Sequence, residues 1–440
     1  MRLYAFGVKH EGARPGVSAG RCILQARSIR VIWVGWCDAV IACSNNEDGD
    51  GVGAGVGQQN KNGGGKVGVG EPRVRDLMIM YMGTGLTAAQ KEYLMSDSDL
   101  KRALPFSPDR DNGSEVIFFG STMHDGLRGY VLTVKSGEDA RDAADQKVVL
   151  FGTDAEIEDT GVPDVQVFGV SDQVEIVKDV KIGSEGHVLV HVELRSRGVD
   201  SVLRFNDFAA LRRYLEAGEM GEGTGAAVLP YELRDPPLCV VNATTMTALD
   251  VDMHVWTETR DPRYSKCLGR PYDGTLDIAP VPYLEETYVT KVASGGYMSA
   301  ALSSDGELFL WGQACPGSNE ELDVLNGNAE TSALVTGITI DDEQDEFVKC
   351  LDVRIDGQNA EAYDVAVGHG HILVAAQTCK TEGRVKRVLF AAGDNSRDQL
   401  GLAMDADSKK RFEDVTALRD ERIIQLAAAG WSTYVVTLEE

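Results

Sequence analysis

The chain has 440 residues, of which 43% are hydrophobic and 25% are charged, so it can fill a large core and remain soluble. Acidic residues outnumber basic ones by 69 to 43, and the net charge of −26 argues against direct binding of nucleic acid. The sequence has no run of about 18 apolar residues and its start lacks the apolar stretch of a secretory signal, so we expect no membrane contact and a cytoplasmic or nuclear location.

Eight cysteines are scattered along the chain, and no two of them have the Cys-x-x-Cys spacing. That spacing is typical of zinc ribbons and of thioredoxin-like redox pairs, so the sequence argues against both. Cysteines distributed in this way indicate buried thiols in a reducing compartment.

Two kinds of apolar segment alternate along the chain. The first kind, which we name the glycine-ended run, closes with a glycine after an aromatic or other large residue, and each copy predicts a β-strand. The clear copies are residues 3–7, 79–83, 148–152, 308–312 and 388–393, and the degenerate copies are residues 202–206 and 254–258.

The second kind, which we name the turn step, is a small or glycine-rich step followed by a polar residue and an apolar strand. It alternates with the glycine-ended runs, so each unit predicts short strands joined by a turn. The turn steps occupy residues 34–41, 126–132, 182–190, 241–249, 293–302, 367–374 and 427–436.

The spacing of these segments predicts a circular architecture. The interval between glycine-ended runs is 52 to 54 residues in the middle of the chain, which suits a four-stranded propeller blade. The first run has no turn step before it, and the last turn step has no run after it. We therefore expect a single all-β, seven-bladed β-propeller over residues 1–440, closed by pairing of its N-terminal and C-terminal strands.

A glycine-rich stretch at residues 45–72 interrupts the first full blade. It has no apolar periodicity, which predicts a flexible, disordered surface insertion. A phosphate-binding loop is excluded because Gly65-Lys66 is followed by Val67 instead of serine or threonine.

Three shorter segments carry local predictions. Residues 208–215 have the apolar spacing of a short amphipathic helix, which we place on the outside of the ring. Residues 303–306 predict a hairpin turn, since Asp305 and Gly306 both tolerate positive φ. The carboxylate run at 341–346 predicts a solvated loop or, as the less favoured alternative, a docking site for a basic partner.

The C-terminal repeats resemble those of the regulator of chromosome condensation family of seven-bladed propellers. Residues 292–312 are similar to its repeat, and residues 393–402 resemble its G-x-N-x-x-G-Q-L-G signature, with Asp398 where the family has glycine. The match is best over residues 285–440, and the compact alpha-tubulin-suppressor-like propellers are a close class.

The resemblance implies structural roles for the repeat positions and for two histidines, whose rings would bond to the backbone of a neighbouring blade. The glycines before Tyr297 and Trp431 are expected to let neighbouring backbones approach closely. The structural positions are Gly7, Gly83, Gly152, Gly296, Gly312, Gly393, Gly430, His187 and His371.

No catalytic residues, metal ligands or cofactor-binding motif stand out in the sequence. His369 and His371 form a His-x-His pair that could hold a metal, but their position in a turn step favours a structural role. The nucleophile elbow of hydrolases and the His-Glu-x-x-His helix are missing, so an enzyme is disfavoured.

The favoured hypothesis is a non-catalytic, monomeric scaffold that binds a protein partner through loops on one face. The family resemblance implies two alternatives: guanine-nucleotide exchange on a Ran-like small GTPase, or partnership with a tRNA or diphthamide modification factor. A hydrolase or lyase with a site in the central funnel is a third, different class.

Exposed aromatics and arginines are the candidate contact residues. Trp36, Tyr297 and Trp431 follow the glycine step in three turn steps and would line one face, although packing between blades is an alternative role for them. Arg260, Arg263 and Arg270 surround Asp261-Pro262, which indicates a loop.

Overall fold

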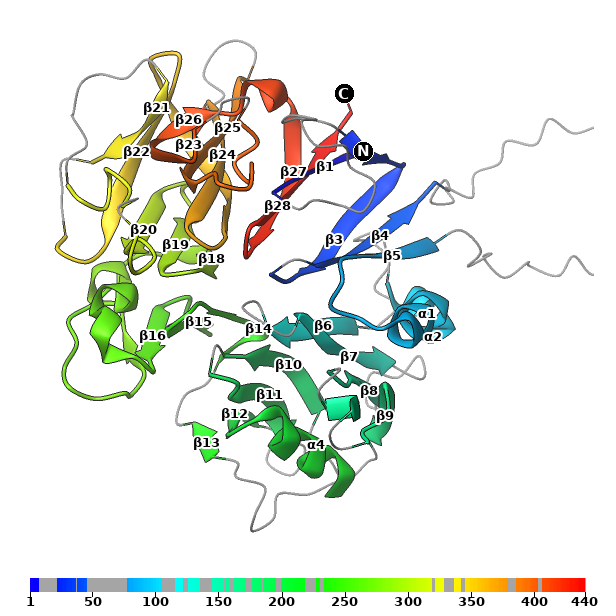
Figure 1. Cartoon of the computed structure of the whole chain (residues 1–440). Helices are drawn as coiled ribbons and strands as arrows, with labels where there is room; N and C mark the ends of the chain where they lie inside the picture. The colour runs from blue at the N-terminus through cyan, green and yellow to red at the C-terminus, as the bar shows by residue number, and fades with distance from the viewer. Residues whose placement is uncertain are drawn as a thin grey trace, which may run out of the picture.

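The fold comes from a computed structural model, in which most of the described residues are β-strand and few are helix. In Figure 1 the strands follow one another around a common centre in chain order, and the two ends of the chain lie side by side. The structure describes residues 1–7, 22–36, 38–45, 77–104, 115–121, 126–134, 145–153, 156–158, 161–170, 176–183, 185–194, 199–217, 227–229, 233–318, 321–327, 336–341, 345–378, 385–402 and 406–439. Residues 46–72 of the expected insertion and residues 342–344 of the carboxylate run lie outside these ranges.

Strands from both ends of the chain form one antiparallel sheet, which we name the terminal group. Its order is β2-β1-β28-β27, and Leu3 of β1 lies opposite Val436 of β28. The expected pairing of the N-terminal and C-terminal strands is therefore present. The strands are β1 (Arg2–Phe6), β2 (Cys22–Gln25), β27 (Arg422–Ala429) and β28 (Ser432–Leu438).

The next sheet has three strands, and two helices cover its outer side. Thr87 and Gln90 form a capping box at the start of α1, and the Gln90 amide donates to the carbonyl oxygen of Gly152 at 2.7 Å, which ties the helix to the following group. The elements are β3 (Ser28–Val34), β4 (Ala39–Ser44), β5 (Leu77–Met82), α1 (Ala88–Ser96) and α2 (Ser98–Ala103).

Two four-stranded antiparallel groups come next, and a single parallel pairing of Ile182 with Ser121 joins them into one sheet. The first contains β6 (Glu115–Ser121), β7 (Gly126–Val134), β8 (Asp145–Phe151) and β9 (Val165–Val170). The second contains β10 (Ile176–Ile182), β11 (Val188–Leu194), β12 (Val199–Phe205) and β13 (Ala227–Leu229). The predicted helix is α4 (Phe208–Ala217), which packs Phe208, Leu211 and Tyr214 against this sheet.

A four-stranded sheet with two short 3-10 helices follows. Its elements are β14 (Leu233–Val241), β15 (Thr245–Asp250), β16 (Val255–Thr259), η1 (Pro262–Leu268), β17 (Ala279–Pro280) and η2 (Pro282–Leu284).

The last sheet again contains two antiparallel groups, joined where β22 pairs with β23. The first contains β18 (Val289–Gly295), β19 (Met298–Ser303), β20 (Leu308–Gly312), β21 (Gly337–Ile340) and β22 (Lys349–Ile355). The second contains β23 (Gln358–Val367), β24 (His371–Thr378), β25 (Arg387–Asp394) and β26 (Ser408–Asp414), with η3 (Thr416–Leu418) after it.

The repeat prediction is confirmed strand by strand. The glycine-ended runs lie on β1, β5, β8, β12, β16, β20 and β25, and each pairs with the strand that follows a turn step. The turn after β19 also forms, but only Gly306 of the Asp305-Gly306 pair has positive φ. Asp398 itself adopts a φ of +63°, so it keeps the left-handed position at which the resembling family has glycine.

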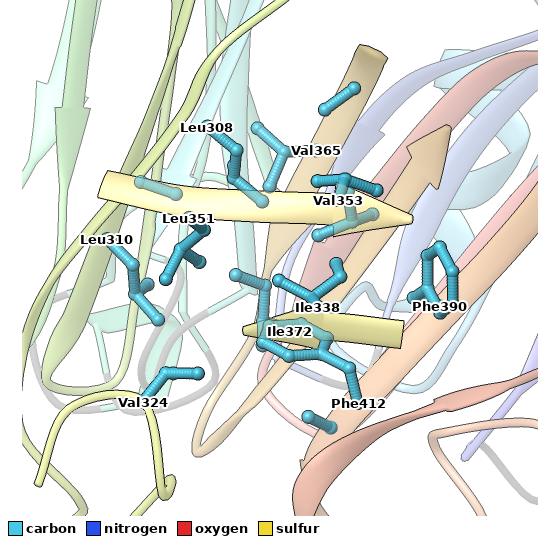
Figure 2. Close-up of a cluster of buried hydrophobic side chains, with 14 of the residues drawn as sticks. Leu308, Leu310, Val324, Ile338, Leu351, Val353, Val365, Ile372, Phe390 and Phe412 are labelled. Atoms are coloured by element: carbon cyan, nitrogen blue, oxygen red, sulfur yellow. The ribbon is translucent and has the colours of Figure 1, made fainter. Parts of the chain in front are cut away.

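Buried hydrophobic clusters fill the contacts between neighbouring groups. Figure 2 shows the largest, in which Leu308, Leu351 and Val353 meet Val365 and Phe390 from the next group. Another, which includes Leu3, Ile41 and Tyr434, joins the terminal group to β3–β5. The middle strands, such as β4, β19 and β28, are buried on both sides, which explains why their sequences are continuous runs of small and apolar residues.

In the described residues, no helix has the length and apolar character needed to span a membrane.

Candidate functional site

Five hairpin turns gather on one face, which we name the turn face. In successive groups these turns contact one another: the Ala243 amide donates to the Gly296 carbonyl at 2.9 Å, and the His369 amide donates to the Gly430 carbonyl at 2.7 Å. The turns lie at residues 35–38, 242–245, 295–298, 368–371 and 429–432.

Two glycines allow this close approach. A Cβ atom on Gly430 would lie 2.4 Å from the Trp36 carbonyl oxygen, and one on Gly296 would lie 3.0 Å from the Gly370 nitrogen. Both residues also have positive φ, +50° and +56°. At both positions the backbone of a neighbouring turn approaches the glycine closely.

Three aromatic rings from three different groups meet on the turn face. The Trp36 ring lies 4.8 Å from that of His369 and 4.7 Å from that of Trp431, measured between centroids. The exposed Arg397 places its guanidinium 5.1 Å from the centroid of the Trp431 ring. A cation over an indole stabilises the pair and leaves a surface that is both apolar and positive.

A second aromatic pair adjoins the first set. Tyr297 follows Gly296, and its ring lies 5.0 Å from that of Tyr264 in an edge-to-face arrangement. The guanidinium of Arg263 lies 5.5 Å from the Tyr264 ring and pairs with Asp261, which lowers the pKa of that carboxyl group. The two sets meet because Gly296 packs against the Cα atom of His369.

These aromatic side chains are partly exposed, and none of them belongs to the buried hydrophobic clusters of the described residues. Trp311 shows the contrast, since it is 0% exposed and lies inside such a cluster. The rings of the turn face therefore pack between the turns and also remain partly open to solvent.

A thiol–imidazole pair lies beside the aromatic rings. The Sγ atom of Cys315 lies 3.3 Å from Nε2 of His369. Burial is the main cause that raises the pKa of Cys315 to about 11, with Asp394 adding to it, and burial lowers the pKa of His369. Both groups are therefore neutral at pH 7, unlike the thiolate–imidazolium pair that activates a cysteine nucleophile.

The two residues of the His-x-His pair contact different neighbours. His369 lies against Trp36 and Cys315, whereas the ring of His371 is buried and its Nε2 lies 3.0 Å from the hydroxyl of Thr433. No cluster of three potential metal ligands forms among the described residues.

His187 and His371 occupy equivalent places beneath a glycine. A Cβ atom on Gly183 or on Gly368 would lie 2.1 Å from the Cε1 atom of the corresponding ring. Burial lowers the pKa of each histidine to about 4, with Arg260 and Arg204 contributing at His187. His371 does reach the neighbouring group, but it bonds to a side-chain hydroxyl and not to backbone as expected, because β28 presents Thr433 to it.

The three arginines predicted together are placed differently. Arg263 is exposed, and Arg260 lies 3.7 Å from Glu258, next to the turn at residues 242–245. Arg270 is only 5% exposed, and its guanidinium donates to the carbonyl oxygens of Thr257 and Asp277 at 3.0 and 3.2 Å. Its contacts stabilise the loop around it, so we assign it no part in the turn face.

Sequence reasoning did not identify Tyr264, His369 and Arg397 as members of this surface. Arg397 falls within the signature-like segment at 393–402, which indicates a loop next to a repeat turn but not a ring beneath its side chain. The sequence predicted the loop around Asp261-Pro262 and its arginines, but it did not single out Tyr264, which directly follows Arg263.

No family model and no curated protein sequence matches the chain. Among solved structures, that of human WBSCR16 is similar over 100% of both chains, with a TM-score of 0.53 and 14% identity. Prp20p from Saccharomyces cerevisiae, described with its binding to Gsp1p and histones, gives a TM-score of 0.47 and 13% identity over 82% of this chain and 79% of that one. Yeast RCC1 (Prp20) bound to Kap60 gives 0.43 and 14% over 76% and 69%.

At these identities the likeness concerns the fold alone. Together with the strand order, it shows that the chain has an RCC1-like β-propeller fold.

Proposed function

We propose that the chain is a closed seven-bladed β-propeller that acts as a non-catalytic scaffold and binds a protein partner through the turn face. Closure is supported by the pairing of β1 with β28 and by the hydrophobic clusters on both sides of the terminal group. A ring sealed in this way leaves its turns as the variable surface that contacts other molecules.

The single observation that carries the proposal is the set of partly exposed rings at Trp36, His369 and Trp431, with Arg397 over one of them. Tryptophan, tyrosine and arginine are the residues that dominate binding energy at protein interfaces. Rings already packed on one another lose little side-chain entropy when a partner covers them, so more of the buried area stabilises the complex.

The test is the double substitution W36A/W431A, compared with Y288A. Tyr288 is 58% exposed and precedes β18, so it lies at the opposite end of that strand from the turn face and is a matched aromatic control. Immobilised wild-type chain should capture a partner from its native extract. Binding of that purified partner should be at least about thirtyfold weaker for the double variant and unchanged for Y288A. Equal binding by all three proteins would overturn the proposal.

The identity of the captured protein decides between the family-derived alternatives, a small GTPase or a modification factor. If it is a GTPase, release of bound nucleotide is measured with and without the chain, since exchange requires the chain to favour the nucleotide-free state. Acceleration that is lost in W36A/W431A would assign exchange to the turn face.

A further inference from the structure

A cavity of about 510 Å³ lies between the group β23–β26 and the terminal group. Arg422 begins β27, and the opposite end of that strand carries the turn with Gly430, so the cavity lies away from the turn face. Its polar lining residues are Arg387, Arg422, Tyr363 and Gln377, and no acidic residue lines it among the residues that the structure describes. The two guanidinium groups offer donors only.

Arg422 brings an uncompensated positive charge to this lining. Arg422 forms no ion pair with any residue that the structure describes, in a chain with a net charge of −26. The nearby Asp364 carboxylate is already occupied, because it accepts from the ammonium group of Lys291 and from the Leu426 amide at 2.8 Å. The positive charge of Arg422 is therefore available to a ligand.

Among the residues that the structure describes, the hydroxyl group of Tyr363 lacks a hydrogen-bond acceptor. The Tyr363 oxygen is covered from bulk water, and its hydroxyl finds no acceptor in the described part of the chain. Burial raises the pKa of Tyr363 to about 12, so the hydroxyl keeps its proton and remains a donor. A buried donor without an acceptor is costly, and a bound ion or water is a common explanation of such a group.

The rest of the lining is aliphatic. Val385, Ile423 and Ile424 form this part, and Ile424 is 40% exposed. The cavity volume falls in the range of small-molecule sites and exceeds what a single inorganic anion fills. An occupant therefore needs an apolar part as well as an anionic group.

We propose that this cavity binds a small phosphomonoester, with its phosphate between Arg387 and Arg422 and its organic part against the three aliphatic side chains. The guanidinium of Arg422 supplies the uncompensated positive charge that attracts the phosphate, and the planar forks of the two guanidinium groups match the geometry of its oxygens.

The test is calorimetric titration of the full chain with phenyl phosphate, with benzoate and inorganic phosphate as comparison probes. We expect phenyl phosphate to bind more tightly than either. R422Q should weaken it by at least about tenfold, and R422K should fall between R422Q and wild type because lysine keeps the charge but loses the fork. Melting temperatures verify that each variant is folded.

R397Q is the matched control, since it removes an arginine from the turn face and should leave phenyl phosphate binding unchanged. No binding of phenyl phosphate to the wild type, or equal binding by wild type and R422Q, would overturn the proposal. Binding of inorganic phosphate as tight as that of phenyl phosphate would overturn the role of the aliphatic lining. The outcome is independent of the proposed scaffold function, because W36A/W431A should bind phenyl phosphate normally.

Discussion

The β23–β24 turn and the β3–β4 turn share one backbone hydrogen bond but differ in the polar side chain that they bury. In each, the amide of the first residue donates to the carbonyl of the fourth, from Gly368 to His371 at 2.9 Å and from Gly35 to Asp38 at 2.8 Å. In each, the glycine packs directly on the side chain of that fourth residue. The fourth residue is a histidine, His371, in the β23–β24 turn and an aspartate, Asp38, in the β3–β4 turn.

Both side chains connect their turn to the next group. His371 contacts the Thr433 hydroxyl of β28 at 3.0 Å, while Asp38 accepts from the Tyr81 hydroxyl at 2.9 Å and from the Leu127 amide of β7 at 3.1 Å. The shared requirement is a small residue above a buried polar group that reaches its neighbour. The fold therefore specifies the position and the burial of this group, but not which chemical group it is.

The largest expected effect is a loss of stability at acid pH that comes from the His371 turn and not from the Asp38 turn. His371 is 0% exposed, and its pKa falls from 6.5 to about 4, so the unfolded chain binds more protons than the folded one between these values. Its contribution to stability is complete above pH 6.5 and is lost as the pH falls toward 4, by about 3 kcal/mol. Urea unfolding across this range should show a shallower loss of stability for H371Q than for wild type.

H254Q serves as its control, because His254 is partly exposed at the turn between β15 and β16 and lies outside the turn face. A wild-type profile that H371Q leaves unchanged would show that the buried imidazole does not set the acid sensitivity of this region.

The next largest effect is the loss of unfolding free energy when Gly35 or Gly368 is replaced by alanine. Neither Gly35 nor Gly368 has positive φ, so the cost of alanine comes from contact alone. A methyl group would lie 2.1 Å from the ring of His371 in G368A and 2.2 Å from Asp38 in G35A, and each variant should lose about 2 kcal/mol of unfolding free energy. G169A, whose methyl group meets nothing within 4 Å, should be nearly neutral.

The two turns should then respond differently to a second substitution. Removing the ring in H371S opens space, so G368A should cost less in that background. Removing the carboxylate in D38S should not rescue G35A, since the Trp33 ring still lies 2.4 Å from the added methyl group. Rescue in both turns, or in neither, would contradict the contact geometry.

Local patterns account for what the sequence could predict. Each glycine-ended run and each turn step is a pattern of a few consecutive residues, so these patterns place the strands and the aromatic residues Trp36, Tyr297 and Trp431. The apolar spacing at residues 208–215 places the helix at Phe208 in the same way. The helix α1 takes the place of an outer strand and was not predicted, although its capping residues Thr87 and Gln90 are visible in the sequence.

Contacts between distant residues account for what could not be predicted. The partners of Asp38 are 43 and 89 residues away, and Cys315 is 54 residues from His369. A single aspartate or cysteine carries no signal of such a partner. The cavity at Arg422 is likewise formed only when the last group packs on the one before it.

The smallest expected effect is the pH dependence of stability at Asp38, which has the opposite sign to that at His371. Burial raises the pKa of Asp38, although the Tyr81 and Leu127 donors partly offset it, so the folded chain binds more protons than the unfolded one above pH 3.8. Stability from this group is therefore complete below pH 3.8 and declines as the pH rises through the raised pKa. Unfolding free energies of wild type minus D38N should fall with increasing pH, whereas those of wild type minus H371Q should rise. D305N, at an exposed turn, should show no such trend. A flat difference for D38N would mean that this carboxylate is solvated in the folded chain and that the two turns are not equivalent in burial.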